Sequence, residues 1–295
     1  MRIIRSISVM NAYRRALHRE GVRIGFVPTM GALHQGHRAL IRTARLACDA
    51  VVVSIFVNPS QFGPREDFLR YPRQMKQDAA MCREEGVDVL FAPSRDAMYP
   101  PAFQTAVAVH ALSQRWEGAH RPTHFGGVAT VVTKLFNIIR PHAAFFGQKD
   151  YQQVVVVRRL VADLNIDTAI VQCPIVREPD GLAMSSRNVY LTVAQRRAAP
   201  VLYEALQAGG TAIHEGNRDA TRIRRAMLMK VAEEPLVQVE YMSVCDPDSL
   251  EPLKRITGKV VLLGAIRLEP VRLIDNLLVK GTAKGLRRKV VSPLR

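Results

Sequence analysis

Cysteine and long apolar runs are scarce in this chain of 295 residues, and each shortage narrows the class of protein. The cysteines lie far apart and form no C-x-x-C pair, which excludes a zinc ribbon or disulfide scaffold and favours reduced, buried thiols in a cytoplasmic protein. The longest apolar run, residues 51–57, is far shorter than the ~20 residues of a membrane span. No continuous apolar stretch follows Met1–Ser6, so we expect no signal peptide. The four cysteines are Cys48, Cys82, Cys173 and Cys245.

Acidic residues are also in short supply, since 26 Asp and Glu stand against 42 Lys and Arg, for a formal charge of +16. Part of the excess lies in a basic tail over residues 281–295, for which the sequence suggests no role. A basic chain is compatible with nucleic acid, anionic lipid or a polyphosphate substrate. No aromatic-interleaved basic patch or zinc finger accompanies the charge, which argues against a nucleic-acid partner and favours a solvated basic surface.

Apolar residues are plentiful, and they predict a sizeable core. Hydrophobic residues make up 48% of the chain and charged residues 23%, which excludes a disordered chain. Up to Arg177, short β-rich runs alternate with helical patterns, and this alternation predicts a parallel sheet with helices on both faces. The expected strands are residues 24–27, 51–57, 87–91, 105–109, 143–146 and 169–171. The expected helices are residues 9–19, 38–47, 74–85, 128–139 and 152–163.

The pattern changes after Arg177. Two helical stretches are followed by three β-rich runs with no helix between them, as in a small antiparallel sheet packed with helices. These helices are expected at residues 193–208 and 220–232, and the strands at 237–244, 259–265 and 271–274. Turn-forming residues at Arg177–Gly181 predict the junction. The sequence thus predicts an α/β chain with domains over residues 1–177 and 178–280, the second a smaller α+β domain, and the tail over 281–295.

The strongest local signal is the segment 28–37, which follows an expected strand, contains glycines and leads into an expected helix. A strand, a glycine-containing turn and a helix N-terminus together predict an anion site, because backbone N–H groups and the helix dipole point at the anion. His34 and His37 add donors for negative charge that develops on phosphorus. An ordinary loop with two histidines is the first alternative. A metal pair is the second, although no H-E-x-x-H motif or third ligand accompanies them.

Four further polar segments lie near the expected ends of strands or in turns. In an open α/β sheet such ends form the ligand-binding edge. Taken alone, the two serines of Met184–Arg187 are as typical of a helix cap or a turn as of a phosphate site. The other segments are Phe56–Phe62, Arg121–Phe125 and Phe145–Gln153.

These segments carry a family resemblance. His34-Gln35-Gly36-His37 resembles the His-x-Gly-His element of the nucleotidyltransferase superfamily. Met184–Arg187 resembles the superfamily's Lys-Met-Ser-Lys-Ser element, with Ala183 in place of the first lysine. In their order and spacing, the segments closely resemble the pantoate–β-alanine ligases, densely over residues 21–190 and more weakly through 272–276. The resemblance implies a Rossmann-like N-terminal domain and a homodimer. The junction at Arg177–Gly181 separately suggests that the C-terminal domain is a mobile lid that carries Ser185–Arg187.

The resemblance also implies a reaction and its binding residues. In an ATP-dependent ligase of this kind, pantoate's carboxylate attacks the α-phosphorus of ATP, and pyrophosphate leaves. The amine of β-alanine then attacks the acyl carbon of pantoyl adenylate, and AMP leaves. Gln61 and Gln153 would bind pantoate, and Gln61 would also meet β-alanine. The implied ATP contacts are Met30, Gly31, Ala32, Leu33, His34, Gln35, Gly36, His37, Gly147, Gln148, Lys149, Asp150, Val176, Met184, Ser185, Ser186 and Arg187.

Adenylate formation needs positive charge around the triphosphate, a task of positioning and electrostatics. The catalytic candidates for this task are His34, His37, Lys149 and Arg187, and His37 is the implied proton donor. The stretch around Asp78 is less acidic than in many family members, which leaves this carboxylate as the one protein ligand expected for Mg²⁺.

Two other functions compete with this interpretation. A different His-x-Gly-His nucleotidyltransferase would act on a phosphorylated acceptor and would need a basic cluster near Asn58 and Gln61, where the sequence instead has neutral amides. An RNA-binding protein on a synthetase-like fold would use the basic charge and the tail, and it would show steeply salt-sensitive RNA affinity and no turnover.

Overall fold

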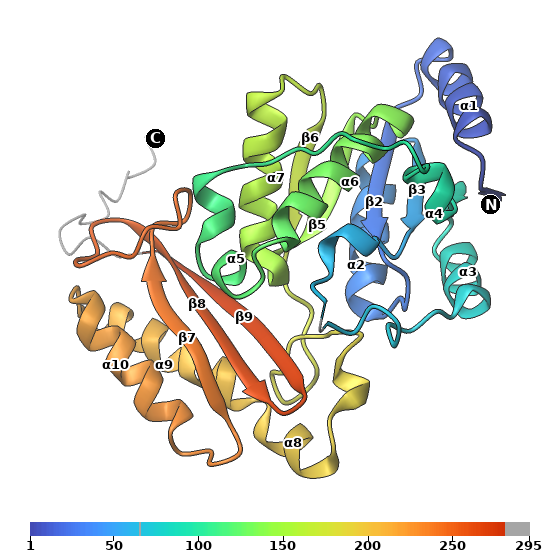
Figure 1. Cartoon of the computed structure of the whole chain (residues 1–295). Helices are drawn as coiled ribbons and strands as arrows, with labels where there is room; N and C mark the ends of the chain where they lie inside the picture. The colour runs from blue at the N-terminus through green and yellow to red at the C-terminus, as the bar shows by residue number, and fades with distance from the viewer. Residues whose placement is uncertain (65, 281–295) are drawn as a thin grey trace, which may run out of the picture. The chain divides into compact units, whose positions relative to one another are not determined.

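The computed structural model describes residues 1–64 and 66–280, so the basic tail predicted over 281–295 lies outside the described residues. The chain divides into two compact units, Met1–Leu191 and a second unit that begins at Thr192 (Figure 1). Residues 178–191, which the sequence assigned to the second domain, therefore belong to the first unit. The reason is local, because the Arg177–Gly181 turn folds back on itself through an antiparallel bridge between Arg177 and Ala183.

The first unit is built on a parallel sheet of six strands in the order β1-β4-β3-β2-β5-β6. Five of the strands were predicted. The sixth, β1, pairs through only three residues at the sheet edge, too short a run for period-2 alternation to reveal. The strands are β1 (Arg2–Ile4), β2 (Ile24–Thr29), β3 (Ala50–Ile55), β4 (Val89–Phe91), β5 (Ala143–Gly147) and β6 (Ala169–Cys173).

The strand predicted at residues 105–109 was wrong. This segment is irregular, and the backbone N–H of Val107 donates to the hydroxyl of Thr130 at 3.0 Å instead of to a neighbouring strand. A β-branched composition alone does not distinguish a strand from an extended segment whose backbone donor has a side-chain partner.

Helices cover both faces of this sheet, as predicted. Successive strand residues point to opposite faces, and Val27 packs in one cluster with Ile41 of α2. Its neighbour Phe26 lies edge-on to Phe136 of α6 on the other face. The segment Val154–Val157, rich in β-branched residues, is buried within α7, which confirms the predicted helix. The helices are α1 (Ile7–Arg19), α2 (Gln35–Ala47), α3 (Met75–Glu84), α4 (Arg95–Met98), α5 (Glu117–His120), α6 (His124–Ile139) and α7 (Tyr151–Asp163).

The second unit is the predicted α+β arrangement, an antiparallel sheet in the order β7-β8-β9 with helices packed on it. Helix α9 contacts β8 and β9, and α10 contacts β7 and α9. The predicted helix over 193–208 is two helices, because Pro200 lacks the N–H that a continuous helix would need. The elements are α8 (Val193–Ala198), α9 (Val201–His214), α10 (Ala220–Val231), β7 (Gln238–Cys245), β8 (Lys259–Leu268) and β9 (Val271–Lys280).

The strand order of the first unit determines where a ligand can bind. From β2 the chain moves to one side through β3 and β4, and it then returns to place β5 and β6 on the other side. Figure 1 shows β3 on one side of β2 and β5 and β6 on the other. The strand order therefore reverses between β2 and β5. In open parallel sheets, the crevice outside the carboxyl ends of the strands at such a switch point is the ligand site.

All four cysteines are buried thiols, as predicted. Within residues 1–64 and 66–280, no helix has the length and apolar content needed to cross a bilayer.

Candidate active site

The loop after β2 is held by a buried carboxylate on α3. Asp78, only 1% exposed, accepts the backbone N–H of Ala32 at 3.0 Å and that of Leu33 at 2.8 Å, one on each carboxylate oxygen. Gly31 stands at φ +84°, and a Cβ there would lie 3.0 Å from Asp78 Oδ2. The backbone N–H groups of Ala32 and Leu33, two of the donors that the sequence suggested for an anion, thus bind Asp78 instead.

His34 and His37 close the N-terminus of α2 by capping each other. The Nδ1 of His34 accepts the N–H of Gly36 at 3.1 Å, and the Nδ1 of His37 accepts the N–H of His34 at 3.2 Å. The ring centroids are 4.2 Å apart. Because each Nδ1 is an acceptor, each neutral ring carries its proton on Nε2. The pair therefore offers two Nε2–H donors at one helix N-terminus, where the helix dipole favours an anion.

Both histidines are held in the neutral form. Burial lowers the pKa of His34 to about 4, and the nearby positive charge of Lys149 adds to the effect. Burial also lowers the pKa of His37 to about 3, with a further contribution from His34. Two neutral donors cost less to bury side by side than two cations would, and they remain donors across the physiological pH range.

The segment after β5 brings a cation to the same crevice. Gly147 ends β5, and residues Gln148–Asp150 form one 3₁₀ turn that leads into α7. Lys149 Nζ lies 3.6 Å from an oxygen of Asp150. Burial raises the pKa of Asp150, but Lys149, His124 and Arg187 together outweigh it and hold that pKa below its ordinary value. Since Lys149 also lowers the pKa of His34, the structure brings the β2 and β5 segments within electrostatic reach of each other.

The Met184–Arg187 segment lies beside the histidine turn. A Cβ on Gly36 would stand 4.0 Å from the Cβ of Met184, and the Met184 N–H donates to the carbonyl of Val176 at 3.0 Å, just beyond the end of β6. The N–H of Arg187 donates to the hydroxyl of Ser185 at 3.2 Å, so this serine shapes its own turn. The segments implied to bind ATP therefore meet at one edge of the sheet.

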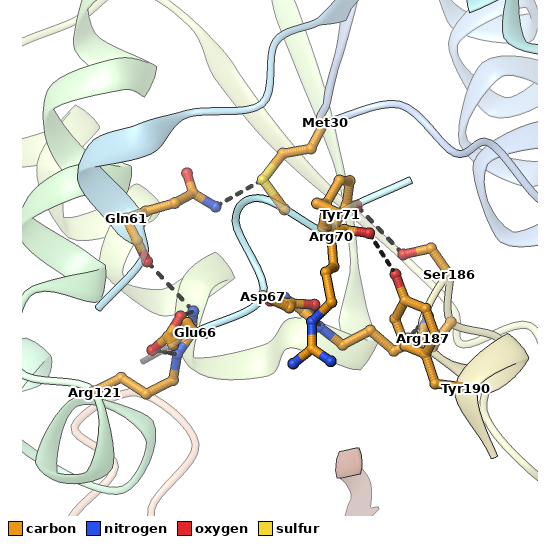
Figure 2. A network of polar contacts seen from close by, with 11 residues as sticks. Met30, Gln61, Glu66, Asp67, Arg70, Tyr71, Arg121, Ser186, Arg187 and Tyr190 are labelled. Carbon is orange, nitrogen blue, oxygen red and sulfur yellow. Dashed lines mark hydrogen bonds and ion pairs between the residues drawn. The ribbon is translucent and has the colours of Figure 1, made fainter. Parts of the chain in front are cut away.

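Arg187 has partners that the sequence did not suggest. Its Nε and Nη2 donate to the two oxygens of Asp67 at 2.8 and 2.9 Å, and its guanidinium lies 5.7 Å from the ring centroid of Tyr71. The hydroxyls of Tyr71 and Ser186 are 3.3 Å apart (Figure 2). Asp67 lies 120 residues before Arg187, and no motif joins the two positions. Their pairing is therefore visible only in the folded chain.

Gln61 is buried, with its amide oriented by two side chains. Its Oε1 accepts from Asn58 Nδ2 at 3.0 Å, and its Nε2 donates to Met30 Sδ at 3.1 Å (Figure 2). Its backbone carbonyl accepts from Arg121 Nη2 at 3.3 Å and from His124 Nδ1 at 3.0 Å. The predicted pantoate residue is therefore fixed in the turn after β3, next to a residue implied to bind ATP.

The comparison with known proteins agrees with this arrangement. The family model described as pantoate-beta-alanine ligase matches residues 2–278. The chain belongs to this family. The pantothenate synthetase of Heliobacterium modesticaldum is 51% identical over 280 residues, which cover 95% of this chain and 100% of that protein. The pantothenate synthetase of Thermotoga neapolitana is 50% identical over 279 residues, which cover 95% of this chain and 100% of that protein. The resemblance deduced from the motifs is confirmed.

Solved structures of the family share the fold. The pantothenate synthetase of Thermus thermophilus superposes with a TM-score of 0.90 at 47% identity, covering 94% of this chain and 99% of that one. The pantoate-beta-alanine ligase of Francisella tularensis, complexed with β-γ ATP and β-alanine, gives a TM-score of 0.78 at 36% identity, covering 94% and 97%. The Rossmann-like parallel sheet with a smaller α+β domain is therefore confirmed.

The second predicted pantoate residue, Gln153, is half-buried in the first turn of α7, directly after the Lys149 segment. Its neighbour Gln152 is buried and holds the segment before α5. The Nε2 of Gln152 donates to the carbonyls of Leu112 and Arg115, each at 2.7 Å. Gln152 therefore has a structural role, whereas Gln153 is the residue predicted to bind pantoate.

The metal role predicted for Asp78 finds no support in the contacts of its carboxylate, because both oxygens accept backbone N–H groups. Among residues 1–64 and 66–280, no group of three or more His, Cys, Asp or Glu side chains is arranged to hold a metal ion. The donor set thus does not fit a cation held mainly by protein ligands.

Proposed function

We propose that the chain joins pantoate to β-alanine at the expense of ATP, through pantoyl adenylate. A carboxylate and an amine barely condense in water, so the acyl group first needs a good leaving group. The pantoate carboxylate oxygen bonds to the α-phosphorus as the bond to pyrophosphate breaks. The β-alanine nitrogen then bonds to the acyl carbon, loses a proton, and AMP leaves.

The observation that carries this proposal is the pair of neutral histidines at the switch point. Their Nε2–H donors can meet an oxygen of the α-phosphate or of the departing pyrophosphate, and each such donor aimed at developing charge is worth about 2.7–4 kcal/mol. His37 is the proposed donor to the growing charge, and Lys149 and Arg187 are the proposed cations for the triphosphate. A guanidinium suits this task because it can meet two phosphate oxygens at once.

The acceptor side of the proposal rests on neutral amides. Gln61 is oriented by Asn58 and Met30, and an amide both donates to a carboxylate and accepts from a hydroxyl. Gln61 and Gln153 would therefore bind pantoate, and Gln61 would also meet β-alanine, since both substrates must reach the same acyl carbon. The remaining implied ATP contacts on the segments after β2, β5 and β6 would line the nucleotide.

For Mg²⁺, we propose that the ion enters with the nucleotide, bound by phosphate oxygens and water. Asp78 would act on the ion only through the loop that it holds.

The homodimer and the cytoplasmic location also stay predictions. A mobile lid that carries Ser185–Arg187 is a further prediction, and ATP-dependent protection of the Met184–Arg187 amides from hydrogen exchange would test it.

Pyrophosphate release tests the proposed function. With ATP and pantoate alone we expect release of about one equivalent per active site, and with β-alanine added we expect continuous release together with AMP. Release that depends on a phosphorylated acceptor, with no response to pantoate, would instead support a different nucleotidyltransferase. No release with either acceptor would refute catalysis by nucleotidyl transfer.

A further inference from the structure

Two consecutive carboxylates lie on the segment between the Gln61 turn and α3, and they pair with arginines on opposite sides. Glu66 accepts from Arg121 Nε at 2.8 Å and from Nη2 at 2.5 Å. Asp67 accepts from Arg187 Nε and Nη2 at 2.8 and 2.9 Å (Figure 2). Both pairs are bidentate, a geometry that fixes the plane of the guanidinium as well as its distance.

Neither pair is an ordinary surface ion pair. The side chains of Arg187 and Asp67 are 30% and 22% exposed, and those of Arg121 and Glu66 are 17% and 25% exposed. Burial raises the pKa of each carboxyl, but its arginine outweighs this effect and holds both pKa values below their ordinary range. Both pairs are therefore charged at neutral pH, in surroundings that strengthen a charged hydrogen bond.

Each arginine reaches a different part of the site. Arg121 also donates to the backbone carbonyl of Gln61, the proposed pantoate residue. Arg187 is the proposed phosphate cation. Asp67 takes the Nε–Nη2 edge of its guanidinium, so the Nη1 nitrogen projects away from Asp67, and the Tyr71 ring lies 5.7 Å from the guanidinium carbon. A long, flexible side chain is thereby held in one orientation before any ligand arrives.

We propose that Glu66 and Asp67 are positioning residues that divide the two substrates between them. Asp67 aims Arg187 at the phosphates of ATP, and Glu66 fixes Arg121 and, through it, the Gln61 turn that binds pantoate. This inference rests on the proposed function. In this arrangement, the adjacent residues Glu66 and Asp67 link the nucleotide site to the acceptor site. Each carboxylate acts through its arginine and not by direct contact with a substrate.

The competing interpretation of Asp67 is that its carboxylate occupies the place of a phosphate and must be displaced. The two interpretations predict opposite changes in ATP affinity when Asp67 is replaced. If Asp67 aims Arg187, its loss weakens ATP binding. If Asp67 competes with phosphate, its loss strengthens ATP binding, because a repelling negative charge disappears.

The test uses Asp67→Asn and Glu66→Gln in the full chain, each serving as the other's matched control. Both changes keep size and remove one charged acceptor. We expect Asp67→Asn to raise the KM for ATP and the Kd for ATP alone by about tenfold, with the KM for pantoate within about twofold. We expect Glu66→Gln to raise the KM for pantoate by about threefold and to leave ATP affinity unchanged. This effect is the smaller one because His124 also donates a hydrogen bond to the Gln61 carbonyl. Asp67→Glu should restore part of the ATP affinity.

A double-mutant cycle separates this inference from the proposed function. If Arg187→Ala leaves ATP affinity unchanged, then the proposed phosphate role of Arg187 fails, and this inference fails with it. If Arg187→Ala weakens ATP binding, then adding Asp67→Asn to it should cause no further loss, because the two residues act through one contact. Additive losses, tighter ATP binding by Asp67→Asn, or equal effects of the two carboxylate variants on both substrates would each overturn the inference. Urea midpoints would establish that every variant is folded.

Discussion

Replacing Asp78 by Asn would test whether this carboxylate anchors the loop after β2. Its oxygens accept the N–H groups of Ala32 and Leu33 at 3.0 and 2.8 Å, and the side chain is 1% exposed. An amide has one acceptor oxygen, so in the variant an NH₂ group faces one of these N–H donors. One bond is lost, a buried donor is stranded, and the other bond loses its charged partner.

The expected loss follows from these contacts. A hydrogen bond to a charged group is worth about 1.5–3 kcal/mol, and a stranded buried donor costs about 1–3 kcal/mol. Removing a buried charge offsets part of this, so we expect Asp78→Asn to lower the free energy of unfolding of the first unit by about 2–3 kcal/mol. The KM for ATP should rise as well, because the same loop carries His34 and His37.

Trp116, the one tryptophan of the chain, lies in the first unit, so its fluorescence during urea unfolding follows that unit. Asp88→Asn is the control, since Asp88 accepts one backbone N–H and is 39% exposed, and it should lose less than about 1 kcal/mol. If Asp78 instead served only Mg²⁺, Asp78→Asn without magnesium would be as stable as the wild type or more stable. That outcome would refute the anchoring role.

Three other outcomes are expected. Gly127→Ala should destabilise the first unit by about 1–3 kcal/mol and raise the KM for pantoate, because its Cβ would lie 2.6 Å from the Gln61 Cα. Gly126→Ala, in the same helix and with nothing within 4 Å of the new Cβ, should leave the KM for pantoate unchanged and stabilise the unit by up to about 1 kcal/mol. The wild-type free energy of unfolding, measured with urea, should fall as pH drops from about 6.5 to 4. In this range the unfolded chain binds a proton at His37, whereas the folded chain does not. His37→Gln should therefore make the free energy of unfolding less dependent on pH. Gln153→Ala should raise the KM for pantoate about tenfold and spare that for ATP, and a selective ATP defect would place Gln153 in the nucleotide pocket instead.

Local patterns predicted the elements and motifs of this chain well. The alternation of β-rich and helical runs predicted the parallel sheet, because its inner strands β2, β3, β4 and β5 are buried on both faces and consist of nearly continuous apolar runs. The histidine turn was visible because its spacing is contained in one short segment between a strand and a helix. Boundaries were harder, since the Arg177–Gly181 turn has the composition of a junction yet folds back into the first unit.

Long-range partners could not be predicted in the same way. The direction of the Ala32 and Leu33 N–H groups depends on Asp78, which lies more than 40 residues further on. Asp67 meets Arg187 across 120 residues, and either residue alone is typical of a solvated surface. Such pairs arise from the way α3 and the loops pack on the sheet edge, which no local period encodes.

Separate measurement of the two half-reactions in His37→Ala decides whether His37 stabilises charge during adenylate formation. Pyrophosphate release with ATP and pantoate should slow by about 10²–10³. Synthetic pantoyl adenylate supplied to the same variant should still react with β-alanine much faster than the variant completes the overall reaction. Adenylate formation near the wild-type rate in His37→Ala would show that His37 does not stabilise this charge.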